Sequence, residues 1–228
     1  MLKAAIFDLD GTLIETEHLQ YGAWAEVLRP LGVELGREEY VTQYAGKVGE
    51  LIEAGLAKKY GLETAPGSLL GQKEEMVLEF FKTRPLKPMP YAREAVDSLA
   101  SQGLKLAVAT TSPRGEARVK LQRAGLYDSF YAIAPGDEVE NAKPHPDLHL
   151  LAMGWLGAGP EECIAFEDSR YGVEAAKAAG ITCLAVPSEY FGYQDLSQAD
   201  KVFKDLREAV GWAKKEYKLR RTSSGALA

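Results

Sequence analysis

The segment AAIFDLDGTLIETE (residues 4–17) places two aspartates directly after a short apolar run. The run Ala4–Phe7 predicts a buried parallel strand, and Gly11 allows the chain to turn sharply beyond it. Open α/β sheets hold their ligands at the carboxyl ends of such strands. The segment therefore predicts an α/β protein with a ligand site beside Asp8 and Asp10.

Asp8 and Asp10 lie on the same side of the predicted strand, because alternate residues of a strand point in the same direction. Two carboxylates facing one site favour a hard cation such as Mg2+. One of them is also suited to act as a nucleophile while the other transfers protons. The alternative is that both aspartates merely end the strand and cap the next helix.

The composition is typical of a soluble globular protein. Of 228 residues, 46% are hydrophobic and 26% are charged, and the formal net charge is −6. The acidic balance argues against nucleic acid or an anionic membrane as a partner. No apolar run approaches the ~18 residues of a membrane span, and Asp8 and Asp10 interrupt the first one, so we expect neither a membrane span nor a secretory signal.

The cysteine content is low and points to a reducing compartment. Cys163 and Cys183 lie in or beside apolar runs, which favours reduced buried thiols over a disulfide or a metal site. We therefore expect a cytoplasmic protein. Separately, we expect a monomer.

Helical and strand patterns are separated along the chain. Helical spacing recurs from residue 17 to about residue 83 with no strand-like run, whereas strands and helices alternate after residue 90. This arrangement predicts a Rossmann-like parallel sheet with helices on both faces, into which an all-helical cap domain is inserted. The predicted ranges are 1–16 and 85–220 for the core, 17–84 for the cap and 221–228 for a disordered tail. Ile14–Glu17 and the proline-rich Arg84–Pro90 are the predicted hinge.

Three further polar segments follow predicted strands. The hydroxyls at the start of TTSPRG (residues 110–115) are placed to bind phosphate beside a helix start, although such residues also simply cap helices. Lys143, in NAKPHPDL, is either a cation of the site or a solvated surface lysine. Glu167 and Asp168, in AFEDSRYG, either complete a metal site or balance a helix dipole.

Taken in this order, the segments resemble the four motifs of the haloacid dehalogenase superfamily, over about Ala4 to Pro187. The resemblance implies that Asp8 forms an aspartyl-phosphate, that Asp10 is the acid and base, and that Lys143 offsets charge repulsion in the transition state. It also implies a phosphate site made by Thr110, Thr111 and Lys143, and Mg2+ ligands among Asp8, Asp10, Glu167 and Asp168.

The helical insertion, with AGKVGELI (residues 45–52) and KPHPDLHLLA (residues 143–152), is similar to the β-phosphoglucomutase-like, CbbY-like subfamily. That subfamily contains sugar-phosphate phosphatases and mutases. The mutases carry a His at the position of Gln20 and an Arg at that of Gly49, and both are missing here. An acid at position 10 points to phosphate esters, so the resemblance favours a phosphatase for a small phosphorylated metabolite.

Two alternatives remain open, a β-phosphoglucomutase-type mutase and a non-catalytic sensor of a phosphorylated ligand. The residues expected to contact the rest of the substrate are Gly46, Lys47, Ser112 and Arg114. Lys47 lies in a loop that projects into the active site in the family, although it is equally well explained as a solvated lysine. Lys47 and Arg114 are also the candidates to replace the missing mutase arginine.

Overall fold

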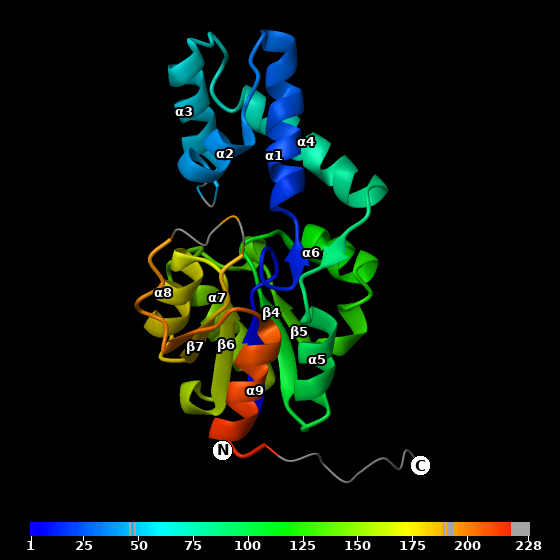
Figure 1. Ribbon diagram of the computed structural model, residues 1–228, viewed down its shortest axis with the longest axis vertical. Coiled ribbons are helices and arrows are strands. Elements are labelled where there is room, and N and C mark those ends of the chain that lie inside the picture. Colours follow the sequence, from blue (N-terminus) through cyan, green and yellow to red (C-terminus); the bar gives the residue numbers. More distant parts are fainter. Residues whose placement is uncertain (46, 48, 189, 191–193, 220–228) are drawn as a thin grey trace. The chain divides into compact units, whose positions relative to one another are not determined.

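The computed structural model describes residues 1–45, 47, 49–188, 190 and 194–219. Gly46 and the predicted tail, residues 221–228, lie outside the described residues. The chain divides into two compact units, Met1–Glu15 with Lys87–Ala228, and Thr16–Leu86. The sequence predicted that the helical unit spans residues 17–84, and the compact unit of the structure spans Thr16–Leu86. Figure 1 traces both units along the chain.

The larger unit is built on a six-stranded parallel sheet in the order β5-β4-β1-β6-β7-β8, as predicted for a Rossmann-like fold. Because β1 lies inside the sheet, its carboxyl end is flanked by the ends of β4 and β6. The strands are β1 (Ala4–Phe7), β4 (Lys105–Ala109), β5 (Ala132–Ala134), β6 (Cys163–Glu167), β7 (Thr182–Ala185) and β8 (Lys201–Val202).

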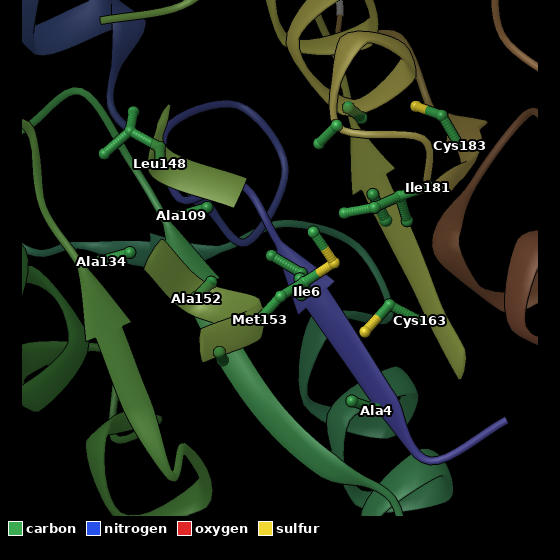
Figure 2. Close-up of a cluster of buried hydrophobic side chains, with 14 of the residues drawn as sticks. Ala4, Ile6, Ala109, Ala134, Leu148, Ala152, Met153, Cys163, Ile181 and Cys183 are labelled. Carbon is green, nitrogen blue, oxygen red and sulfur yellow. The ribbon is translucent and has the colours of Figure 1, made fainter. Parts of the chain in front are cut away.

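Helices cover both faces of this sheet. Leu148, Ala152 and Met153 of α7 pack against Ile6 and other small residues of the strands in a buried cluster that also includes α8 (Figure 2). The right-handed rule for parallel crossovers places α5 and α6 on the opposite face, where α5 contacts α9. The helices are α5 (Ala92–Ala100), α6 (Arg114–Arg123), α7 (Asp147–Leu156), α8 (Arg170–Ala178) and α9 (Leu206–Glu216), and 3-10 turns span Tyr127–Ser129, Gly136–Glu138 and Pro160–Glu162.

The smaller unit consists of α-helices and one 3-10 turn among its described residues. Its helices are α1 (Glu17–Leu28), α2 (Arg37–Gln43), α3 (Gly49–Tyr60) and α4 (Ser68–Thr83), with a 3-10 turn at Arg29–Leu31. Trp24 is fully buried in it, and α1 and α3 both contact α4. α1 ends at Leu28, ahead of Pro30, which cannot continue an α-helix, and Leu31 in the following 3-10 turn is 45% exposed.

The two segments predicted to link the units pair with each other. β2 (Ile14–Glu15) and β3 (Lys87–Pro88) form a short antiparallel ladder, and the Met89 N–H donates to the Leu13 carbonyl at 2.8 Å. Cys163 and Cys183 are free and buried, as predicted. Among the described residues, no helix has both the length and the apolar character that crossing a membrane requires.

Candidate active site

Three carboxylates meet at the carboxyl ends of β1 and β6. Asp8 follows β1, and its backbone N–H donates to the Phe166 carbonyl of the neighbouring strand at 3.0 Å. Glu167 ends β6 and Asp168 follows it. One oxygen from each of the three side chains lies within 4.8 Å of the others, and all three residues are buried. Parallel pairing of the two strands therefore brings the first and last predicted motifs together.

Lys143 lies between two of these carboxylates. Its Nζ is 2.6 Å from Asp8 Oδ1 and 2.8 and 3.0 Å from the two oxygens of Glu167. The side chain is 5% exposed, which excludes the solvated alternative. Burial opposes the charge of Lys143, but Asp8 and Glu167 together outweigh it and raise its pKa above the ordinary value.

Burial and charge set the three carboxylates apart. Burial raises the pKa of Asp8 to about 7, against the opposing effect of the Lys143 ammonium. Burial likewise raises the pKa of Asp168 well above its ordinary value, and the charges on Asp8 and Glu167 add to the rise. For Glu167 burial is outweighed by Lys143 and the neighbouring His149, so that its pKa is lowered. Without a cation, the cluster therefore retains protons near neutral pH.

The cluster fits a hard divalent cation. Its donors are all carboxylate oxygens, the ligands that Mg2+ prefers. Asp168 Oδ2 is buried, and no hydrogen-bond partner is found for it among the residues that the structure describes. Gly11 has φ +88°, and a Cβ at this position would lie 1.9 Å from the same oxygen, so this approach requires glycine. An unsatisfied buried acceptor beside two further carboxylates is the arrangement that a bound cation would complete.

Asp10 is held by a different set of side chains. Ser112 Oγ donates to Asp10 Oδ2 at 2.9 Å, and Lys120 Nζ lies 2.6 Å from Asp10 Oδ1. Asp10 was predicted as a metal ligand as well as an acid and base, but the three-carboxylate group found among the described residues does not include it. Its side chain is 27% exposed, so it remains open to a substrate or to water.

Residues 5–186 match the family model of the haloacid dehalogenase-like hydrolases. The chain belongs to this family. It is 36% identical to Protein CbbY of Rhodobacter capsulatus, over 92% of this chain and 96% of that protein. It is 37% identical to a phosphorylated carbohydrates phosphatase of Thermotoga maritima, over 79% of this chain and 82% of that protein.

A solved structure of a CbbY protein is also similar to this chain. CbbY from Rhodobacter sphaeroides in complex with phosphate is 31% identical, with a TM-score of 0.77 over 91% of this chain and 96% of that chain. These comparisons support the CbbY-like subfamily within the haloacid dehalogenase-like hydrolases, as the sequence motifs predicted.

In this hydrolase the predicted phosphate-binding hydroxyls follow β4, next to β1. Thr110 is 1% exposed, and its Oγ1 accepts from the Ser112 N–H at 3.1 Å. The Thr111 side chain is exposed. Ser112 contacts Asp10 and Lys120, and its predicted contact with the substrate stays a prediction.

Two further residues, Arg114 and Lys47, were predicted to contact the substrate. Arg114 is paired with Glu138 through both Nε and Nη2 and also donates to the Ile133 carbonyl. Its predicted contact with the substrate stays a prediction. Lys47 is exposed and belongs to the helical unit. Its predicted contact with the substrate stays a prediction.

Two buried side chains of this site were missed by the sequence interpretation. Lys120 is fully buried, as is His149, whose Nε2 lies 3.0 Å from Glu167 Oε1. Burial lowers the pKa of His149, which favours a neutral ring despite the nearby Glu167. Both residues occupy core-facing positions of α6 and α7, beside Leu121 and Leu148. A polar residue within an apolar helical stripe is the signal that would have identified them.

Proposed function

We propose that the protein is a Mg2+-dependent phosphatase that hydrolyses a small phosphorylated metabolite, such as a sugar phosphate, through an aspartyl-phosphate. The observation that carries the proposal is the buried Asp8 carboxylate, with the Lys143 ammonium 2.6 Å away and Asp168 and Glu167 beside it. A relative named as a phosphatase of phosphorylated carbohydrates and a relative solved with phosphate support this substrate class.

In the first half of the proposed reaction, a carboxylate oxygen of Asp8 forms a bond to phosphorus while the bond from phosphorus to the leaving oxygen breaks. Asp10 gives its proton to that oxygen, which departs as an alcohol. The Lys143 ammonium offsets the repulsion between the carboxylate and the phosphate dianion. Thr110 and Thr111, after β4, would orient the phosphoryl oxygens.

In the second half, Asp10 takes a proton from a water molecule, whose oxygen attacks phosphorus. The bond between phosphorus and Asp8 then breaks, which restores the carboxylate and releases inorganic phosphate. Mg2+ held by Asp8, Glu167 and Asp168 would stabilise the negative charge that develops on the phosphoryl oxygens.

The helical unit is proposed to act as a cap that opens for substrate exchange and excludes water during chemistry, with β2 and β3 as its hinge. Gly46 and Lys47 would then contact the substrate beyond its phosphate. Monomeric state and location in the cytoplasm stay predictions from the sequence.

The mutase alternative requires a cationic anchor for a second phosphate. Glycine at position 49 has no side chain and supplies no such cation. The missing cation at this position supports hydrolysis over mutase activity.

The test is phosphate release from a panel of sugar phosphates, phosphoglycolate and nucleotides, with and without Mg2+, beside the variant Asp8→Asn. We expect Mg2+-dependent release from the wild-type protein and none from Asp8→Asn, whose circular dichroism should be unchanged because the substitution hardly alters side-chain volume. Turnover retained by a clean preparation of Asp8→Asn would contradict the covalent mechanism. If the wild type releases no phosphate, isomerisation of β-glucose 1-phosphate with a bisphosphate primer would indicate a mutase. Inactivity in both assays would favour the third alternative, a non-catalytic sensor of a phosphorylated ligand.

A further inference from the structure

A lysine is buried on the side of α6 that faces the protein core. Lys120 is fully buried, and so are Ala117 and Leu121 on either side of it in the helical stripe. An ammonium group placed in an apolar interior is strongly destabilising unless other groups compensate its charge and hydrogen bonds. The partners of Lys120 therefore indicate why a lysine occupies this position.

Lys120 contacts Asp10 and two other polar side chains. Its Nζ lies 2.6 Å from Asp10 Oδ1, 2.9 Å from Ser112 Oγ and 2.5 Å from Glu116 Oε1. Glu116 is one turn earlier on the same helix, so it holds Lys120 from its own element. Burial opposes the charge of Lys120, but Asp10 and Glu116 outweigh it and raise its pKa above the ordinary value.

Lys120 also determines which way the Ser112 hydroxyl points. This hydroxyl has one proton, and it accepts a hydrogen bond from Lys120 at 2.9 Å. The proton is thereby directed to a carboxylate. Asp10 Oδ2 lies 2.9 Å from the hydroxyl oxygen and Glu116 Oε1 lies 3.1 Å from it, so the shorter distance favours donation to Asp10. Asp10 is thus held at both oxygens, by Lys120 directly and by Ser112 whose hydroxyl Lys120 orients.

We propose that Lys120 is a positioning residue that, together with Ser112, fixes the Asp10 carboxylate for its two proton transfers. This inference rests on the proposed phosphatase function, in which Asp10 first protonates the leaving oxygen and then accepts a proton from water. A carboxylate has about four acceptor sites, so the bonds to Lys120 and Ser112 leave room for the transferred proton. General acid–base catalysis contributes about 10²–10⁴-fold and depends on hydrogen-bond geometry.

The decisive variant is Lys120→Met, which keeps the length of the side chain and removes its ammonium. It is compared with the wild type on two substrates, an alkyl phosphate from the active panel and p-nitrophenyl phosphate. Nitrophenolate leaves without a proton, whereas an alkoxide needs one. We expect kcat/KM, which reports the steps up to departure of the leaving group, to fall ~10-fold or more further for the alkyl phosphate than for p-nitrophenyl phosphate.

A second readout follows the hydrolysis of the aspartyl-phosphate, which also needs Asp10. In Lys120→Met we expect phosphorylated protein to accumulate during turnover, detected by intact-protein mass spectrometry after acid quenching. A lysine that merely supports the fold would lower activity on both substrates by the same factor and would not produce this species.

Lys177→Met is the control, because Lys177 pairs with Asp200 at 2.6 Å in the same unit and neither residue belongs to the three-carboxylate group. It should leave both kcat/KM values unchanged. Should Lys120→Met fail to fold, Glu116→Gln is the second variant, since it weakens the ion pair with Lys120 without burying a new apolar group. We expect kcat/KM to fall further for the alkyl phosphate than for p-nitrophenyl phosphate here too, but by a smaller factor.

The outcomes separate the two proposals. An active wild type and an inactive Asp8→Asn, with equal losses on both substrates and no phosphorylated protein in the Lys120 and Glu116 variants, would overturn the positioning role alone. A wild type that releases no phosphate would overturn the proposed function and this inference with it.

Discussion

The Lys143 ammonium lies between two buried carboxylates, so its removal should unbalance the charge of the site. We predict that Lys143→Met lowers the free energy of unfolding of the metal-free protein by ~3–5 kcal/mol at pH 7.5, the range for buried ion pairs that lose one partner. The range for buried ion pairs applies here because the side chains of Lys143, Asp8 and Glu167 are 5%, 12% and 0% exposed.

The same substitution should make stability depend on pH in a defined direction. Lys143 helps to hold the pKa of Glu167 below its ordinary value; without the ammonium, burial raises it instead. The folded variant then binds protons that the unfolded chain releases, so its stability falls as pH rises above the ordinary pKa of a glutamate. Between pH 5 and pH 7.5 the difference from the wild type should grow by up to ~1.4 kcal/mol per pH unit.

The assay is denaturant unfolding followed by circular dichroism at both pH values, with and without Mg2+. Mg2+ should restore part of the lost stability, since it supplies the missing positive charge. Lys3→Met is the matched control: Lys3 pairs with Glu162 at 2.7 Å, but the two side chains are 60% and 33% exposed, so the loss should stay within ~1 kcal/mol. A loss for Lys143→Met no larger than that of the control, or equal at the two pH values, would refute the reasoning.

Two further predictions concern the metal site. Burial raises the pKa of Asp8 to about 7, and a ligand must lose its proton to bind a cation, so Mg2+ affinity should increase as pH rises through 7 and binding at pH 6 should release protons. Calorimetry in buffers of different ionisation enthalpy measures this, and proton uptake would contradict it. His149→Phe keeps an aromatic ring but removes the imidazole nitrogen 3.0 Å from Glu167, so Mg2+ affinity should fall ~10-fold. An unchanged affinity in the same titration would show that His149 does not orient Glu167.

Much of the α/β fold was predictable because its strands are short continuous apolar runs. The predicted strand Ala4–Phe7 is β1, and the predicted helical stretch from residue 17 to about residue 83 contains α1 to α4. The ladder of β2 with β3 was missed, because two-residue strands carry no periodicity and their pairing joins segments more than 70 residues apart. Such pairing depends on where the helical insertion returns, which no local pattern records.

The candidate site divides along the same line. Asp8, Glu167 and Asp168 were found from the sequence because they lie at strand ends, and parallel pairing brings strand ends to one edge of the sheet. Lys143 lies in the longer connection after β5 and was found through the family resemblance. Lys120 lies within a helix, where i,i+4 spacing after Glu116 predicts an ordinary surface ion pair. Its difference from a surface lysine arises from burial, which in the sequence is signalled only by its place in the apolar stripe with Ala117 and Leu121. The residues proposed to carry out the chemistry are thus marked by local sequence, whereas the residue proposed to position one of them is recognised once a buried charge is traced to its partners.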